Sequence, residues 1–251
     1  MISFFRKILQ KFLSNQPAGN SGNRVTRYLA YAIGEIVLVV FGILIALQVN
    51  NWNEDRKANN ARIEYTHALL VELEKDSGQL ADELEAIDRR LETVTSYFDR
   101  LSQSNSNLDT LFKIMRNEAD PSFVRPSNLH TNTYLTLTST GEIGFFDSPL
   151  GEMIQNYYQK ADQTYNSAIE QTRFYQNIFS EYHFNIPKPH EYNDSPVLDQ
   201  LENIMDKPKA LLVFNGMLSI KRFNLRFFKD YHEEMILLNS ELSKRLQESL
   251  N

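Results

Sequence analysis

An apolar run of 22 residues near the N-terminus, Tyr28–Val49, constrains this chain more than any other stretch. The run contains one ionisable side chain, Glu35, and one side-chain amide, Gln48. A helix needs about 20 apolar residues to cross the core of a bilayer. Tyr28 and Trp52 lie at the two ends, where interfacial aromatic residues are expected. A buried core helix is the alternative, but such helices are seldom apolar on every side for about six turns. The run therefore predicts a transmembrane helix over residues 28–49.

The formal charge of −6 is distributed unevenly along the chain. Residues 1–29 hold five basic side chains and no acidic one, which is +5, so the remaining 222 residues carry −11. Basic residues gather at the cytoplasmic end of a span. Arg24 and Arg27, with Tyr28 and Trp52, are the expected interfacial anchors. No A-x-A cleavage site follows the run. We expect an uncleaved anchor in the inner (cytoplasmic) membrane, with a cytoplasmic N-terminus and residues 50–251 in the periplasm.

This boundary divides the chain into a cytoplasmic basic segment and linker (1–27), the span (28–49) and an extracytoplasmic domain (50–251). Apolar residues in the first 14 positions recur at helical spacing with basic residues between them, which favours a helix on the anionic inner leaflet over a frayed tail. The linker Asn15–Asn23 is polar and rich in turn-forming residues. The acidity of the whole chain argues against a nucleic-acid partner.

The extracytoplasmic region has the periodicity of long helices. No Pro occurs between Pro17 and Pro121, so the span can continue as one helix to about Ser102. Its second part carries apolar residues at steps of three and four, a coiled-coil-like pattern. The expected stripe is Ile63, Thr66, Leu70, Leu73, Ser77, Leu80, Leu84, Ile87, Leu91, Val94, Phe98 and Leu101.

Two further long helices are expected after the first. One begins at Ser148 as N-cap, followed by Pro149, and ends near Phe184; the other runs from about Pro208 to Ser249. Leu108–Glu118 and Val197–Met205 suggest short helices. Residues 131–146 favour a short helix ending at Gly141, with a hairpin as the alternative. The prediction is an all-α fold: a transmembrane helix continuing into a long helix, and an elongated antiparallel bundle outside the membrane.

The segment Ala32–Glu54, AIGEIVLVVFGILIALQVNNWNE, resembles the N-terminal signature of a family of uncharacterised single-pass membrane proteins from Bacteroidota. That family shows the pattern IGEIxLVxxGILIALQxNNWNE, followed by a helical domain. The resemblance covers about 23 residues and includes the polar positions Glu35 and Gln48. It implies a membrane anchor and a helical domain, and it implies no activity. The Gly- and Asn-rich linker before the span departs from the family pattern.

Residues that carry chemistry are sparse. The chain has no Cys, which excludes disulfides, thiolate metal sites and a Cys nucleophile. His232-Glu233-Glu234 lacks the second His of a zinc-protease motif, and no phosphate-binding loop or nucleophile elbow occurs. The carboxylate pairs Glu72/Glu74 and Glu83/Glu85 are interpreted as solvated charges, and the Tyr row at 157, 158, 165 and 175 as core. We therefore expect no enzyme activity, no cofactor, no metal site and no catalytic residue.

Glu35 is the residue that is hardest to explain without a functional or structural role. A carboxyl group inside a membrane is costly and tends to face a protein partner, although a protonated Glu near the interface is the alternative. Small residues spaced by four allow helices to approach closely. The candidates for association within the membrane are Ala30, Gly34, Glu35, Gly42, Ala46 and Gln48.

The sequence thus favours a membrane-anchored structural or protein-interaction module of the cell envelope. Its expected partners are the membrane and either a second copy or another membrane protein. The alternative is an extracytoplasmic ligand-sensing subunit that signals through a partner, with its ligand unknown. Such a sensor would have a closed pocket among the tyrosines. An envelope enzyme is the third and least favoured reading.

Overall fold

The computed structural model describes the chain except residues 1–6, 8–23, 124–126, 187–195 and 251. The predicted amphipathic helix of the first 14 residues and the linker 15–23 lie outside the described residues, apart from Lys7. The described residues form helices and no strand, which confirms the all-α prediction. The chain divides into two compact units, Met1–Ala58 and Asn59–Asn251. Each is described by itself below.

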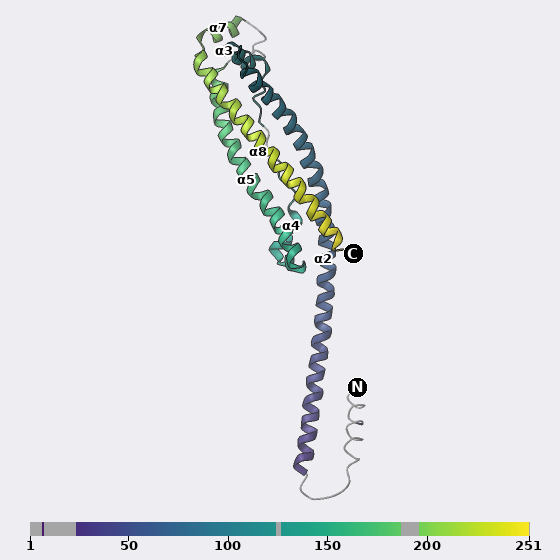
Figure 1. Cartoon of the computed structure of the whole chain (residues 1–251). Helices are drawn as coiled ribbons and strands as arrows, with labels where there is room; N and C mark the ends of the chain where they lie inside the picture. The colour runs from purple at the N-terminus through teal and green to yellow at the C-terminus, as the bar shows by residue number, and fades with distance from the viewer. Residues whose placement is uncertain (1–6, 8–23, 124–126, 187–195, 251) are drawn as a thin grey trace. The chain divides into compact units, whose positions relative to one another are not determined.

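The first described helix, α2, runs from Arg24 to Leu101 (Figure 1). The prediction of one helix ending near Ser102 is confirmed. It needs no break because it contains no Pro, and Gly78, the one Gly in its second half, is tolerated at a cost of about 1 kcal/mol relative to Ala. The hydroxyl of Ser102 donates to the carbonyl oxygen of Phe98 at 2.7 Å and so satisfies one of the last free carbonyls.

The second unit is an antiparallel bundle. Helices α5 (Ser148–Asn185) and α8 (Lys207–Glu248) lie side by side (Figure 1). Lys160 pairs with Glu234 at 2.9 Å, and the rings of Tyr182 and Phe214 lie 5.8 Å apart, which fixes the antiparallel register. Residues 59–101 of α2 form the third long helix. Two apolar clusters along the bundle bring side chains from all three helices together.

The N-termini of α5 and α8 are capped by aspartates. Asp147 accepts a hydrogen bond from the backbone N–H of Leu150 at 2.9 Å, so the N-cap of α5 is Asp147, and the prediction of Ser148 was wrong by one residue. Ser148 instead occupies the first helical position, just before Pro149. Asp206 caps α8 in the same way, accepting from Lys209 N–H at 3.0 Å. A carboxylate also suits the positive end of the helix dipole.

The shorter elements follow the order expected from the sequence. They are α3 (Leu108–Lys113), the π-helical turn η1 (Ile114–Glu118), α4 (Asn132–Thr140), the 3-10 turn η2 (Glu142–Phe145) and α7 (Pro196–Ile204). The helix alternative for residues 131–146 is confirmed. Gly141 ends α4 with φ +77°, which suits a residue without Cβ. The hydroxyls of Thr136, Thr138 and Thr140 each donate to the carbonyl four residues earlier, which lets this Thr-rich segment stay helical.

The predicted stripe on α2 is half right. Thr66, Leu73, Leu80, Ile87 and Val94 are buried as expected. The second row of the seam is shifted by one residue, however, and buries Leu69, Asp76 and Tyr97 in place of the predicted Leu70, Ser77 and Phe98. The sequence pattern selected the more apolar row, whereas the fold buries a row that contains a carboxylate.

The shifted seam makes a direct prediction for two neighbouring leucines. Leu69 is fully buried and Leu70 only partly. Leu69→Ala should lower the free energy of unfolding by about 2–5 kcal/mol, the range for a buried leucine, and Leu70→Ala by clearly less. Urea unfolding followed by circular dichroism checks this. A larger loss of unfolding free energy for Leu70→Ala than for Leu69→Ala would mean that the row containing Leu70 is buried, as the sequence pattern predicts.

Candidate functional site

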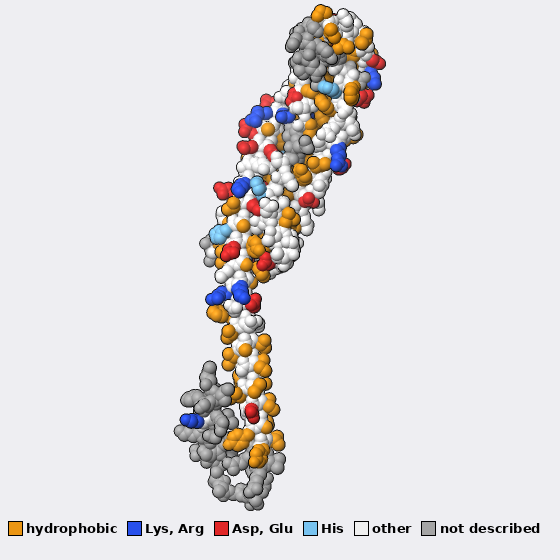
Figure 2. Space-filling model, turned by 180° about the vertical axis from the view of Figure 1, so that it is seen from behind, with side chains coloured by type: hydrophobic (Ala, Val, Ile, Leu, Met, Phe, Trp, Pro, Cys, Tyr) orange, Lys and Arg blue, Asp and Glu red, His pale blue; other side chains and the backbone are white. Residues whose placement is uncertain are grey.

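The first candidate site is the apolar portion of α2 in the first unit. Among the described residues, one helix is long and apolar enough to cross a membrane, and its apolar window is entirely exposed. Figure 2 shows hydrophobic side chains covering the face of this portion that is in view. Exposed side chains of this kind, from Tyr31 to Trp52, would be unfavourable in water. The helix is therefore a candidate membrane span.

Helical geometry separates the predicted association residues into two faces. At about 100° per residue, Gly42 and Ala46 each lie about 20° from Glu35 around the axis of α2, so the three share a face. Gln48 lies about 140° away from Glu35 by the same rule. The side chains of Ala30, Arg24 and Arg27 are outside the described residues. Gly34 lies about 100° from Glu35 and about 40° from Gln48, so it shares the Gln48 face.

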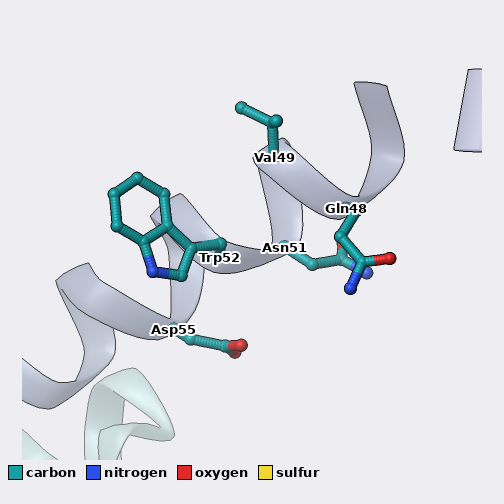
Figure 3. A pocket seen from close by; sticks show the side chains of 5 residues that line it. All are labelled: Gln48, Val49, Asn51, Trp52 and Asp55. Atoms are coloured by element: carbon teal, nitrogen blue, oxygen red, sulfur yellow. The ribbon is translucent and has the colours of Figure 1, made fainter. Parts of the chain in front are cut away.

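A shallow polar hollow marks the C-terminal end of the apolar run. It is lined by Gln48, Val49, Asn51, Trp52 and Asp55, all from α2 (Figure 3). Gln48, Asn51 and Asp55 are spaced by three and four residues and so follow one another along the helix surface. The Arg56 guanidinium lies 5.5 Å from the centre of the Trp52 ring, a cation–π distance. Within about two turns, the surface changes from apolar to amide and then to charged.

The second candidate site lies in the bundle and was not anticipated. Three carboxylates of α2 accept hydrogen bonds from backbone N–H groups of the segment that leads into α4. We call Glu72, Asp76 and Glu83 the carboxylate ladder, and residues 127–133 the latch segment. The contacts run in opposite order along the two chains: Glu72 to Thr133 N at 3.1 Å, Asp76 to His130 N at 2.9 Å, and Glu83 to Ser127 N at 3.3 Å.

Glu83 also holds a fully buried histidine of α8. His232 Nε2 lies 2.9 Å from Glu83 Oε2, and His232 Nδ1 lies 2.7 Å from the carbonyl oxygen of Phe228. Both ring nitrogens therefore face an acceptor, an arrangement that the doubly protonated imidazolium satisfies. Burial acts to raise the pKa of Glu83, but hydrogen bonds from His232 and Ser127 outweigh it and leave the pKa below its usual value. The Glu83 carboxylate thus lies between the His232 ring and the N–H of Ser127.

Asp76 is the most deeply buried member of the ladder. Its side chain is fully inaccessible, and its Oδ1 lies 2.6 Å from His130 Nδ1. Nearby, Asn239 donates to the carbonyl oxygen of Leu73 at 3.0 Å and contacts the Tyr157 hydroxyl at 3.1 Å. Burial raises the pKa of Tyr157, so this hydroxyl stays protonated. Two donors of His130 thus meet Oδ1 of this buried carboxylate, whereas Oδ2 has no hydrogen-bond partner among the described residues.

Side chains from all three long helices donate hydrogen bonds to backbone carbonyl groups of residues 115–122, which precede the latch segment. Tyr97, Tyr175 and Tyr182 donate to the carbonyl oxygens of Glu118, Pro121 and Met115, at 2.9, 2.7 and 3.3 Å respectively. Lys221 donates to the carbonyl oxygens of Asp120 and Ser122, the latter at 2.9 Å, and burial lowers its pKa to about 8. The three helices therefore bind residues 115–122 through backbone hydrogen bonds.

The interpretation of the tyrosine row as core holds for three of its four members, because Tyr165 is only partly buried. Of the four carboxylates interpreted as solvated, Glu74 and Glu85 are exposed as expected. Tyr157, Tyr158 and Tyr175 are fully buried, as expected. Glu72 and Glu83, interpreted as solvated charges, instead face the latch segment. The sequence offers little indication of their role. A carboxylate within a row of apolar residues is normally interpreted as part of the solvent-exposed side of the helix. Among the described residues, no group of three metal-ligating side chains forms. The polar groups engage the protein's own backbone.

The Glu83–His232 pair predicts a loss of stability in acid. Because the folded-state pKa of Glu83 lies below its ordinary value of 4.5, its contribution is complete above that value and is lost as pH falls through the folded pKa. Glu83→Gln should lower the free energy of unfolding at pH 7 by about 1–3 kcal/mol and flatten its decline below pH 5. Urea unfolding between pH 3 and 7 measures both effects.

The matched control is Glu85→Gln. Glu85 lies on the exposed side of α2, where its carboxylate pairs with Arg89. An exposed pair of this kind contributes little to stability, so the control should change it by less than about 0.5 kcal/mol. Equal effects of the two substitutions would contradict a special role for Glu83.

Comparison with known proteins identifies the family and goes no further. No curated protein and no solved structure matches the chain significantly. The model of a family of unknown function, DUF6090, matches residues 35–188. This range contains the exposed apolar part of α2 from Glu35 onward, the carboxylate ladder, the latch segment and α5, and it ends before α8. With well over half of its length matched, the chain belongs to DUF6090, a family of unknown function.

Proposed function

We propose that this protein is a membrane-anchored interaction module of the cell envelope, without catalytic activity. The observation that carries the proposal is the exposed apolar surface of α2 from Tyr31 to Trp52, which has the length and composition of a span. A bundle of three long helices follows on the same chain. Its buried polar side chains are used to hold its own backbone, which favours a structural role over chemistry.

The charge distribution supports an orientation. The five basic residues before the run favour a cytoplasmic N-terminus, and residues 50–251 then lie on the other side of the inner membrane. In a cell with two membranes, such as that of a Bacteroidota species, this compartment is the periplasm. The absence of Cys fits an exported domain that is held together by packing alone.

Self-association through the span is the second part of the proposal. Glu35, Gly42 and Ala46 share one face of α2, and small residues at steps of four permit close helix approach. A carboxyl group within the membrane is stabilised when it meets a polar partner. A second copy provides an identical face, so a dimer would bring two Glu35 side chains together.

The sensing alternative has less support. It requires space for a ligand among the tyrosines. The rings of Tyr157 and Tyr158 pack edge to face with centroids 5.0 Å apart, and Tyr134 stacks on Tyr158 at 4.4 Å. These rings pack directly against one another as part of the core, which leaves the ligand-sensing alternative without support from the packing around them.

Substitution in the span tests the association. Glu35→Ala should reduce the dimer fraction about fivefold, which corresponds to roughly 1 kcal/mol, because it removes the polar contact between two helices. Lysine-reactive crosslinking in native membranes, followed by electrophoresis, measures this fraction. Leu44→Ala is the matched control, since Leu44 lies about 180° from Glu35 on the same helix.

Two results would overturn the association. One is a wild-type protein that stays monomeric in native membranes at every crosslinker concentration. The other is an equal loss of dimer for Glu35→Ala and Leu44→Ala, which would show that the Glu35 face has no special part.

The orientation can be tested because the chain has no Cys of its own. A single Cys at Ser240, which is exposed on α8, should react with a membrane-impermeant maleimide once the outer membrane is permeabilised. A single Cys at Ser14 should react only after the inner membrane is opened. The reverse pattern would place the bundle in the cytoplasm.

A further inference from the structure

The carboxylate ladder forms a continuous contact between α2 and the latch segment. Glu72 accepts from both the N–H and the hydroxyl of Thr133, at 3.1 and 2.9 Å. Asp76 accepts from the N–H and the ring of His130, and both oxygens of Glu83 lie 3.3 Å from Ser127 N. Each rung thus depends on an acceptor-only side chain, and a carboxylate has this property only while it is ionised.

Among the described residues, the basic side chains within ion-pair distance of the ladder carboxylates are two histidines. His130 from the latch segment pairs with Asp76, and His232 from α8 pairs with Glu83. The other titratable groups that face the ladder are tyrosines: Tyr157 and Tyr158 of α5, and Tyr231 of α8. Burial raises the pKa of each tyrosine, so these three hydroxyls remain neutral. No Lys or Arg in the described part of the chain forms an ion pair with a ladder carboxylate.

We propose that the carboxylate ladder is an acid-sensitive latch, which releases residues 127–133 from α2 when its carboxylates take up protons. A protonated carboxyl group loses its negative charge and keeps one acceptor oxygen, so the hydrogen bond that it accepts from an N–H becomes weaker. Carboxylates titrate at acidic pH, around pH 3–5 when unperturbed. Acidification therefore weakens the hydrogen bonds that all three carboxylates accept.

Release should precede unfolding of the bundle, because the two depend on different interactions. Leu129 is the one buried side chain between Ser127 and Thr133, so apolar packing holds the latch segment weakly. The three long helices are held by two apolar clusters, whose burial does not change with pH. Regions with few buried apolar contacts open first.

Hydrogen exchange of the full-length protein in lipid nanodiscs tests the latch. Exchange is measured by mass spectrometry between pH 7 and pH 4, with rates corrected for the intrinsic effect of pH. The amides of 127–133 should lose protection by at least about tenfold at pH 4, while peptides from α5 and α8 keep theirs. The change should reverse when the pH returns to 7.

Variants separate the latch from general acid sensitivity. Glu83→Gln should show at pH 7 part of the exposure that the wild type shows at pH 4, and its response to pH should be smaller. Glu72→Gln acts on the opposite rung and gives a second reading if Glu83→Gln folds poorly. Glu85→Gln, which removes an exposed carboxylate two residues from Glu83, should behave as the wild type does.

Two results would overturn the proposal. Loss of protection in the latch segment, α5 and α8 together would mean ordinary acid unfolding. Unchanged protection of 127–133 at pH 4 would mean that apolar packing, and not the ladder, holds the segment.

Discussion

Peptide groups inside a bundle must find hydrogen-bond partners, and the described residues between α3 and α4 find theirs on side chains. Residues 119–123 and 127–131 have no regular secondary structure. An unpaired backbone group away from water costs about as much as a lost hydrogen bond. Tyrosines, a lysine and three carboxylates supply what a helix or sheet would supply elsewhere. The arrangement of these polar side chains on the three long helices follows from this need.

The same need explains the row that α2 buries. A purely apolar seam would pack well, but it could not bond the latch segment. Leu69, Asp76 and Glu83 follow one another at seven-residue steps, so one row of the helix combines apolar packing with acceptors. Two polar residues of α8 contact the same region of α2: Asn239 bonds the carbonyl oxygen of Leu73, and His232 bonds the carboxylate of Glu83. The polar interruptions in the stripes of α2 and α8 thus meet one another in space.

Much of the fold could be predicted because it depends on local patterns. Helix ends follow Pro, Gly and capping residues, and these fixed the bounds of α5, α7 and α8 to within one or two residues. Gly141 marked the end of α4 in the same way. The apolar span was evident from composition alone. These features require only the chemistry of neighbouring residues along the chain.

The bundle site could not be predicted because its partners are distant in sequence. Glu83 meets Ser127 and His232, which lie 44 and 149 residues away. In the sequence, Glu83 differs in no visible way from Glu85, which is exposed to solvent. Only packing of the three helices distinguishes the two. The shift from Leu70 to Leu69 has the same origin. The spacing of apolar residues along α2 does not show which of its polar residues will bond to the latch segment, and so it does not show which row is buried.

The ladder has a consequence for how this region can vary among relatives. Its carboxylates bond mainly to the main chain of the latch segment, so the side chain at Ser127 is largely free to change. Proline is the exception, because it has no N–H to donate. Related sequences that keep this contact should therefore vary widely at 127, avoid Pro at 127, 130 and 133, and keep an acidic residue at each rung of α2. At the Glu83 rung the constraint falls on the helix, while residue 127, apart from Pro, is free to vary.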